Sequence, residues 1–508
     1  MSLLSCFTDG DGDGGEVDVE KYLQRRKRLM CHFDDHDGLD PDSDDDLAPP
    51  SKKRRLSFPI LARRTEDGDL EVISPTDSIW YLLYVSCPNI DCKQFQRKFR
   101  RRFRMPYESF RTFCLDARAA CWFPRWMGCD ATGKKSSPLE LLILGSLRYL
   151  GRGWTFDDCE ESTAISEEVH RTFFHQFILI GSTVLFDRYV LTPRTKEDVE
   201  KHMEEFKLAG LPGACGSSDA TCIMHEMCSH RLQRIHKGHK SKSATRTYNL
   251  TTDHRRQILA TTSGHPGSFN NKTTVLHDEF ITDIKSGAIL DDYTFELLER
   301  REGKVFKVKY RGVWLVVDNG YHSWSITVPP FTNTNRYDEI RWSEWLESMR
   351  KDVECTFGIL KGWWRILKTG ICLYKVASVD MIWKTCCAFH NMLLKVDGLD
   401  RPWDGEQISM SSYSGRFGDL EFDDMPVALQ RLLSPSEVRE YDTTATATAL
   451  VNAQCPRLVI QREDANQEVL TGDDYSEEEE NACRVVRDLS RIRVVVMLSP
   501  LTRTLPCC

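Results

Sequence analysis

The chain has 508 residues, a formal net charge of −8 at pH 7 and 41% hydrophobic residues, so it is long and apolar enough for two or three domains. It opens without a secretory signal, and no apolar run is long enough to cross a membrane, which excludes the secreted and membrane-spanning classes and predicts that the 19 cysteines are reduced intracellular thiols. The acidic average does not suggest a nucleic-acid binder. Charge is strongly segregated along the chain, however, and its distribution is more informative than its sum.

Residues 1–75 are predicted to be a disordered acidic region, because "DGDGDGGE" and "DDHDGLDPDSDDD" combine high charge with few apolar residues. A basic cluster near the end of this region resembles a nuclear localisation signal and predicts a nuclear protein. The alternative is a solvated basic stretch in a flexible tail. The cluster consists of Lys52, Lys53, Arg54 and Arg55.

The segment "KQFQRKFRRRFR", from Lys93 to Arg104, predicts an amphipathic helix. Its phenylalanines recur every four residues and therefore form one stripe, which would enter a core. The basic side chains cover the other faces and could lie on DNA phosphates without reading sequence. The candidate phosphate contacts are Lys98, Arg100, Arg101 and Arg102.

A small helical region is expected over Ser137 to Ile180. Ser137 is the predicted N-cap of a first helix that ends at Gly151, and Thr155 and Ser166 are predicted to cap two more helices. With Arg148, Arg152 and Arg171, this series could be a helix-turn-helix DNA reader or a plain helical support. We assign residues 76–185 to a helical, basic, DNA-binding domain.

Three later segments each place one carboxylate where a metal ion could use it. They are "GSSDATCI" with Asp219, "GVWLVVDNGY" with Asp318, and "SMRKDVECTFGILKGWWRIL" with Glu354. Two Mg²⁺ ions held by carboxylates can activate a nucleophile and relieve charge on a leaving oxygen, which is what phosphodiester hydrolysis needs. The three segments therefore predict one split metal site that cuts nucleic acid.

The local patterns place these carboxylates on different elements. Gly312–Val317 reads as a buried strand, so Asp318 follows its carboxyl end, where open α/β sheets bind ligands. Asp219 is expected in a similar position, in a short segment after Gly213 and Gly216. Glu354 lies on a helix from Trp342 onward, where Arg350, one turn earlier, could orient it.

The stretch between the carboxylates carries further signals. Tyr248–Asp253 and Gln257–Thr262 are predicted strands joined through "HRR", and Val275–Ile284 a predicted helix. The segment "HRLQRIHKGHKSKSATR" is basic and suited to seating a phosphate backbone beside the metal site, the alternative being a solvated loop. Its candidate contacts are Arg234, Lys237, Lys240 and Lys242.

Histidines and cysteines in the same stretch are candidate zinc ligands. The set comprises Cys222, His225, Cys228, His230, His236 and His239. The spacing Cys-x-x-His-x-x-Cys lacks a second ligand pair at structural-zinc spacing, so the sequence does not favour zinc. Cys386, Cys387 and His390 are predicted to be core residues of a late helix.

The order of these motifs resembles the transposases of Harbinger-type DNA transposons, which include the plant transposon protein group and its domesticated nuclease relatives. The resemblance covers roughly residues 95 to 396. It rests on the segments "LVVDNGY", Glu-x-x-Phe-Gly-x-Leu-Lys around Glu354, and Cys-Cys-x-x-His-Asn. Two positions depart from the family pattern: Asn270-Asn271 replaces an Asn-Asp pair, and Cys222 stands where members often have histidine.

The resemblance implies an α/β fold with an RNase H-like mixed-sheet core, assigned to residues 205–398, and a variable, partly disordered tail over 399–508. It implies that Asp219, Asp318 and Glu354 are the catalytic, metal-binding triad, using Mg²⁺ or Mn²⁺. The implied function is a DNA endonuclease and transposase that cuts the terminal repeats of a transposon and joins them to target DNA. A Myb-like DNA-binding partner protein and a homo-oligomer are also expected.

Two other functions remain open at this stage. One is a domesticated or inactive transposase that binds DNA in a regulatory role without cutting it. The other is a general nuclease of the RNase H-like class that acts on RNA or on RNA–DNA hybrids. Metal-dependent cleavage of duplex DNA separates the first from a transposase, and comparing duplex, hybrid and RNA substrates separates the second.

Overall fold

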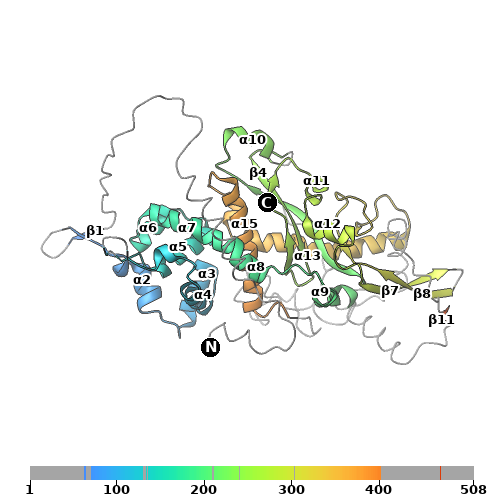
Figure 1. The fold of residues 1–508 in the computed structure, drawn as a ribbon, viewed down its shortest axis with the longest axis horizontal. Coiled ribbons are helices and arrows are strands. Elements are labelled where there is room, and N and C mark those ends of the chain that lie inside the picture. Colours follow the sequence, from blue (N-terminus) through green and yellow to red (C-terminus); the bar gives the residue numbers. More distant parts are fainter. Residues whose placement is uncertain are drawn as a thin grey trace, which may run out of the picture. The chain divides into compact units, whose positions relative to one another are not determined.

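The structure is a computed structural model, and Figure 1 shows its fold. It describes residues 62–64, 70–129, 133, 135–208, 211–238, 241–301, 304–401 and 469–470. All of these belong to one compact unit, Pro59–Cys508. The predicted acidic segments, the basic cluster from Lys52 to Arg55 and almost all of the tail beyond residue 401 lie outside the described residues.

The first part of the described chain is almost entirely helical. Its strands and short helical turns are β1 (Ala62–Arg64), β2 (Leu70–Val72), η2 (Pro75–Asp77), η3 (Leu82–Ser86), η4 (Pro124–Trp126) and η5 (Gly181–Leu185). Its helices are α2 (Ile79–Tyr81), α3 (Lys93–Phe103), α4 (Tyr107–Ala119), α5 (Leu139–Arg152), α6 (Phe156–Thr163), α7 (Glu167–Ile180), α8 (Phe186–Tyr189) and α9 (Lys196–Leu208).

The predicted helix boundaries in this part are largely confirmed. Thr155 caps α6 in a reciprocal capping box with Asp158, and Ser166 is the N-cap residue of α7. The predicted cap at Ser137 is wrong, because α5 begins at Leu139 with Pro138 as its N-cap residue and no side-chain cap. Gly153 ends α5 with a positive φ of 66°, a conformation that costs glycine nothing.

A mixed sheet forms the centre of the second part (Figure 1). Its strand order is β10-β9-β3-β4-β5, and β6 also pairs with β4. The strands β10, β9 and β3 are parallel, whereas β4 and β5 follow antiparallel. The strands are β3 (Ala214–Met224), β4 (Thr245–Thr252), β5 (Ile258–Thr261), β6 (His265–Pro266), β9 (Trp314–Val316) and β10 (Thr327–Val328).

Several predicted elements of this part can be compared with the structure. The two strands joined through "HRR" are confirmed as β4 and β5. The single helix predicted over Val275–Ile284 is wrong, because the chain breaks between α11 (Asn271–Val275) and α12 (Glu279–Ser286). Asp278 causes the break: its side chain caps α12 by accepting a hydrogen bond from the Ile281 amide.

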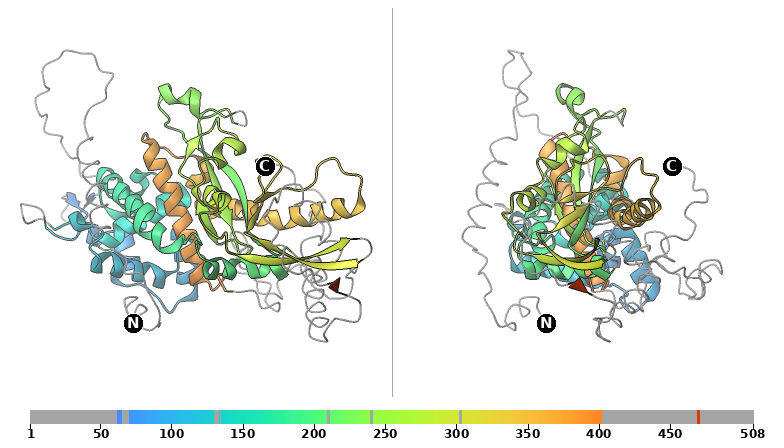
Figure 2. Two further views of the ribbon diagram at one scale, coloured as in Figure 1. Left: turned by 45° about the vertical axis from the view of Figure 1, so that its right-hand side comes forward. Right: turned by 90° about the vertical axis from the view of Figure 1, so that its right-hand side faces the viewer.

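The remaining elements surround this sheet. They are α10 (His230–His236), β7 (Thr294–Arg301), β8 (Lys304–Arg311), α13 (Tyr337–Trp363), α14 (Ile366–Thr369), α15 (Val376–Val396) and β11 (Val469–Leu470). Figure 2 shows the long helix α13, in gold, beside the sheet and the β7–β8 hairpin. The first half of α13 packs on that hairpin and on β9 through Trp342, Leu346 and Met349.

The largest hydrophobic cluster joins the helical part to the sheet. It contains residues of α3 to α7, the second half of α13, and the buried side of α15. Phe99 and Phe103 are fully buried in it, which confirms the predicted apolar stripe of α3. Cys386, Cys387 and His390 are buried on α15, as predicted. None of the helices in the described part of the chain is both long enough and apolar enough to span a bilayer.

Candidate active site

Asp219 and Asp318 are brought side by side by the pairing of β3 with β9. These strands are parallel, and Ser217 is level with Val316. Two residues further along each chain lie Asp219 and Asp318. Residues two apart on a strand share a face, and neighbouring strands lie roughly 4.8 Å apart, so both carboxylates are presented together. One detail of the prediction is wrong: Asp219 lies in the middle of an 11-residue strand and not in a short segment after a turn.

Glu354 reaches the same place from α13, and Arg350 connects it to Asp219. The Arg350 Nη2 atom lies 2.8 Å from Glu354 Oε1, which confirms the predicted pair. Its Nη1 atom lies 3.5 Å from Asp219 Oδ2, and Nη2 also binds Glu347 at 2.9 Å. A single guanidinium group therefore links the helix carboxylate to the strand carboxylate.

The electrostatics of Asp219 show that the three carboxylates influence one another. The pKa of Asp219 is raised from 3.8 to about 6, chiefly by burial and also by the negative charges of Asp318 and Glu354. The Ala220 amide, which donates to Asp219 Oδ1 at 2.7 Å, and the Arg350 charge both lower this pKa. Such a cluster of negative charge gains from a nearby cation.

A buried network of hydrogen bonds connects the residues next to Asp219 and Asp318. The Asn249 amide on β4 donates to Ser218 Oγ at 3.0 Å and to Asp278 Oδ2 at 2.7 Å. The Tyr321 hydroxyl donates to Asn249 Oδ1, so the turn after Asp318 is fastened to β4. Burial, together with the Asp219 charge, raises the pKa of Tyr321 well above its usual value, which keeps this hydroxyl protonated. Sequence reasoning missed this network, although Tyr321 stands in the quoted "DNGY" segment.

Lys361 adds a positive charge beside the site. It lies on α13 seven residues after Glu354, and its Nζ atom donates to Thr221 Oγ1 at 2.7 Å. Thr221 is two residues beyond Asp219 on β3 and therefore on the same face. Burial lowers the pKa of Lys361. The lysine is thus held at the edge of the carboxylate cluster, where a phosphate oxygen could meet it.

The donor set fits a hard divalent cation. Asp219, Asp318 and Glu354 offer carboxylate oxygens, which Mg²⁺ and Mn²⁺ prefer over nitrogen or sulfur. Asp219 is 16% exposed and Glu354 47% exposed at the side chain, so the cluster opens toward solvent on the Glu354 side. A cation with several water ligands can be accommodated at such a half-open site.

The basic residues of α3 divide into two groups. Lys98 and Arg101 are exposed. Arg100 is half-buried, pairs with Asp397 at 2.6 Å and lies over the Trp363 ring. Arg102 is also exposed, but it donates to the Tyr84 hydroxyl. Half of the predicted phosphate contacts on this helix are thus engaged within the fold. In the proposed helix-turn-helix region, Arg148 is also buried, 3.9 Å over the Trp154 ring.

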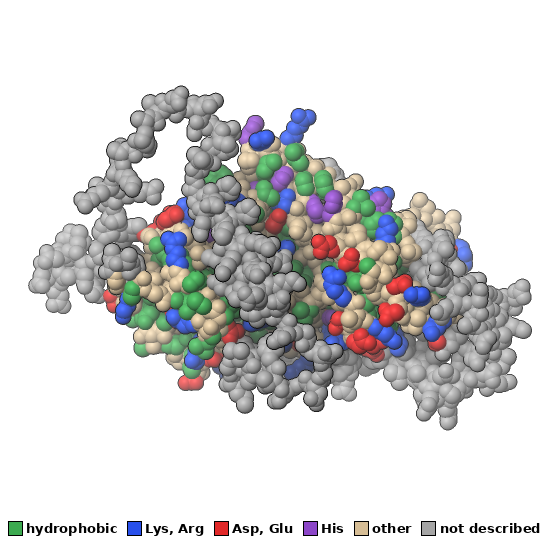
Figure 3. Space-filling model, in the orientation of Figure 1, with side chains coloured by type: hydrophobic (Ala, Val, Ile, Leu, Met, Phe, Trp, Pro, Cys, Tyr) green, Lys and Arg blue, Asp and Glu red, His purple; other side chains and the backbone are tan. Residues whose placement is uncertain are grey.

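The second basic segment lies at α10 and just beyond it. Arg234, Lys237 and Lys242 are exposed there, and Lys240 lies outside the described residues. Figure 3 shows blue basic and purple histidine side chains at the top of the molecule, where α10 lies. Arg246, at the end of this segment, is buried and pairs with Asp380 at 2.6 Å, so it belongs to the interior.

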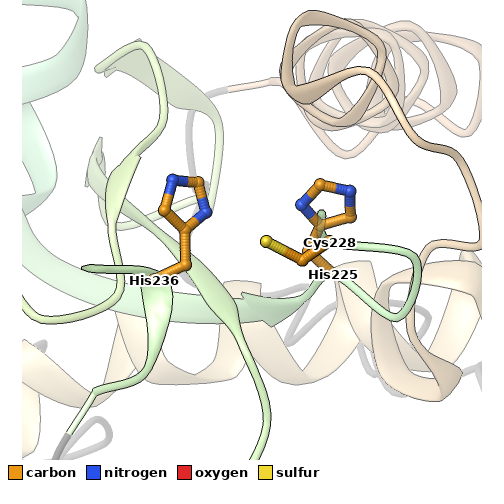
Figure 4. Close-up of side chains that lie close together, drawn as sticks. All are labelled: His225, Cys228 and His236. Atoms are coloured by element: carbon orange, nitrogen blue, oxygen red, sulfur yellow. The ribbon is translucent and has the colours of Figure 1, made fainter. Parts of the chain in front are cut away.

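The structure also gathers three of the histidines and cysteines that the sequence did not favour as a zinc site. His225, Cys228 and His236 are all buried, and their ligand atoms lie within 4.8 Å of one another (Figure 4). Cys222 and His230 are exposed and are not part of this group. The spacing of these three residues in the sequence does not indicate a metal site, because only the fold brings them together.

Comparison with known proteins adds one finding. Residues 187–399 match the family model described as Plant transposon protein. This range includes β3, β9 and α13 and therefore all three carboxylates. None of the curated proteins and none of the solved structures matches the chain. Over these residues the chain is similar to a transposon-related family, which supports a transposase-related role.

Proposed function

We propose that the protein is a metal-dependent DNA endonuclease of the transposase type, with Asp219, Asp318 and Glu354 as its metal ligands. The observation that carries the proposal is their convergence. Asp219 on β3 and Asp318, two residues beyond β9, each follow the paired residues Ser217 and Val316 by two positions. Arg350 joins Glu354 on α13 to Asp219. They are separated by 99 and 36 residues in sequence, so chance proximity in a helix or turn does not explain the cluster.

The fold supports the same proposal. A mixed sheet whose two adjacent parallel strands carry acidic residues, with a helix alongside supplying a third, is the arrangement expected of an RNase H-like nuclease core. The similarity to transposon proteins covers this core. The finer assignment to Harbinger-type transposases rests on the motif order around Asp318 and Glu354 and is part of the proposal.

Each residue has a distinct task in this mechanism. When bound, Mg²⁺ or Mn²⁺ would supply a strong nucleophile and stabilise the leaving 3′ oxygen. Asp219, Asp318 and Glu354 would hold the metal ions, and Arg350 keeps Glu354 turned toward the strands. Lys361 is positioned to bind a phosphate oxygen and so to orient the scissile bond. The freed 3′ hydroxyl would attack target DNA at the same carboxylates.

The DNA would be held by exposed basic side chains outside the carboxylate cluster. On α3 these are Lys98 and Arg101, and near α10 they are Arg234, Lys237 and Lys242. Such contacts neutralise phosphates and fix the register of the duplex without specifying sequence. The proposal also includes a Myb-like partner protein and self-assembly, both of which rest on the family resemblance. It includes nuclear import through the basic cluster Lys52 to Arg55.

The deciding experiment is cleavage of duplex DNA that carries the terminal repeats of the element, with Mg²⁺ or Mn²⁺ and with a co-expressed Myb-like partner. We expect metal-dependent cutting that Asp318→Asn and Glu354→Gln abolish. The matched controls are Asp157→Asn on α6 and Glu344→Gln on α13, both exposed acidic positions, which should cut normally.

Binding without cutting, by wild type and variants alike and with the partner present, would contradict the nuclease. It would favour a transposase-derived DNA-binding regulator, a function that the exposed basic residues of α3 and α10 could serve without the carboxylates. Cutting of RNA or hybrids in preference to duplex DNA would instead point to a general nuclease of the same class.

A further inference from the structure

The group formed by His225, Cys228 and His236 lies outside the carboxylate site and has no part in the proposed cleavage. Its members come from neighbouring pieces of chain. His225 directly follows β3, Cys228 lies in the next turn, and His236 is the last residue of α10. All three side chains are at least nine-tenths buried, with exposures of 2%, 6% and 4%.

The backbone around the group is fixed by hydrogen bonds. The His225 amide donates to the Ala244 carbonyl at 2.9 Å, and Lys237, next to His236, forms an antiparallel bridge with the same Ala244. The Gln233 side chain donates to the Cys228 carbonyl at 3.3 Å. The backbone positions of the three residues are therefore set before any ligand arrives.

The tautomer of His225 follows from its partner. Its Nε2 atom lies 2.7 Å from the Leu373 carbonyl oxygen, and because a carbonyl can only accept, Nε2 carries the hydrogen. In the neutral ring with its hydrogen on Nε2, the Nδ1 atom bears the free lone pair. Metal-bound histidines typically have this arrangement, with one nitrogen donating to a carbonyl and the other facing the ion.

Two buried nitrogens of this group have no hydrogen-bond partner in the part of the chain that the structure describes: His225 Nδ1 and His236 Nδ1. A buried polar atom without a partner costs about 1–3 kcal/mol, and such atoms are rare in folded proteins. Placing two of them beside a buried thiol is hard to explain by packing alone. A cation at the centre of the group would satisfy both at once.

We propose that His225, Cys228 and His236 form a Zn²⁺ site with three protein ligands and a water molecule as the fourth. One thiolate and two imidazoles match the ligand preference of Zn²⁺ and are too soft for Mg²⁺. A tetrahedral zinc ion places its donors roughly 3.3–3.8 Å apart. The three donor atoms already lie within 4.8 Å, so small side-chain rotations close the site. As the zinc–sulfur bond forms, the Cys228 thiol releases its proton to solvent.

Zinc at this point would fasten α10 to the end of β3. Arg234 on α10 and Lys237 after it are exposed, so the ion would also fix two of the proposed DNA contacts. The site would then be structural and separate from the magnesium-type carboxylate cluster. This consequence rests on the proposed function, but zinc binding itself does not.

The test is the metal content of the full chain, purified without a metal-affinity tag and dialysed extensively. We expect about one zinc per chain in the wild type, and less than about 0.2 in Cys228→Ala and His236→Ala. His230→Ala and Cys87→Ser, which change an exposed histidine and an exposed cysteine, should keep the zinc. Asp318→Asn should keep it too, whether or not the nuclease proposal holds.

Replacing zinc with Co²⁺ gives a second readout that does not depend on the variants folding perfectly. Wild-type protein should show a thiolate-to-cobalt charge-transfer band that saturates at one equivalent and is absent in Cys228→Ala. A wild-type chain that holds no zinc and shows no such band would overturn the proposal. So would zinc that all the variants retain equally.

Discussion

At the scale of single residues, the ionised Asp219 carboxylate destabilises the folded protein. It is mostly buried, and its pKa is raised to about 6. A carboxyl group whose pKa is higher in the folded than in the unfolded state binds its proton more tightly when folded. The free energy of unfolding therefore falls as pH rises from about 4 to about 6 and does not recover above that.

This predicts that Asp219→Asn stabilises the metal-free protein while it abolishes cleavage. Because each pKa unit is worth about 1.4 kcal/mol, the gain at pH 8 should be about 3 kcal/mol, and it should vanish near pH 4. Urea unfolding of both proteins at the two pH values measures it. A variant that is less stable than wild type at pH 8 would contradict this account.

Arg350 is the residue that holds the cluster together before metal binds. Its positive charge lowers the pKa of Asp219, and Asp219 must lose its proton to act as a ligand. Removing the charge in Arg350→Ala should raise that pKa, so that Mn²⁺ or Mg²⁺ binding sets in at higher pH than in wild type. Titration calorimetry at a series of pH values gives the profile. Arg350→Lys, which keeps the charge, is the matched control, and identical profiles for Ala and wild type would refute the idea.

At the scale of elements, one buried side chain connects the turn after β9 to β4. Tyr321 reaches under the turn to Asn249 on β4, whose amide in turn binds Ser218 and Asp278. This ties β4, the turn after β9 and the start of α12 into one unit. Tyr321 is three residues after Asp318, and its amide donates to the Asp318 carbonyl, so this connection helps to position Asp318.

Tyr321→Phe should therefore weaken the site without removing any ligand. Loss of the hydroxyl leaves the buried Asn249 oxygen without its donor, which costs about 1–3 kcal/mol of stability. We expect a lower affinity for divalent metal at unchanged stoichiometry, measured by calorimetry, and slower cleavage at subsaturating metal. Tyr374→Phe, at an exposed tyrosine, is the control and should behave as wild type. Equal metal affinity in both variants would show that the turn holds its position without this bond.

At the scale of the whole molecule, α3 buries one face and carries candidate DNA contacts on the other. Its phenylalanines lie in the hydrophobic cluster that also contains the second half of α13 and one side of α15. The Trp363 indole on α13 donates to the Arg104 carbonyl just after α3 at 2.8 Å. The helix that carries candidate DNA contacts is thus attached directly to the helix that carries Glu354.

Arg101→Ala should lower duplex affinity uniformly across sequences, because a phosphate contact carries no sequence information. The slope of log affinity against log salt should fall by about one. Arg111→Ala, at an exposed arginine on α4, is the matched control with no proposed DNA contact. Fluorescence anisotropy at several salt concentrations measures the affinity of both variants for duplex DNA. Equal slopes for the two variants would show that α3 is not part of the DNA-binding surface.

The sequence by itself predicted most of the local elements and pointed to three carboxylates as a candidate site. The apolar run before Asp318 and the helical spacing around Glu354 are local sequence patterns. They predicted the elements observed as β9 and α13. Motif order then pointed to Asp219 as the third member. The break before α12 was missed, since Asp278 is an ordinary polar residue in sequence and becomes a cap only once it is buried.

Only the tertiary structure decided which side chains meet. Arg100 and Arg102 look like Lys98 and Arg101 in sequence, yet the fold gives the first two the partners Asp397 and Tyr84. His225, Cys228 and His236 have no recognisable metal spacing, and the fold nonetheless places them within ligand reach. The reason is that such convergence depends on strand register and on packing between distant elements, which local periodicity does not encode.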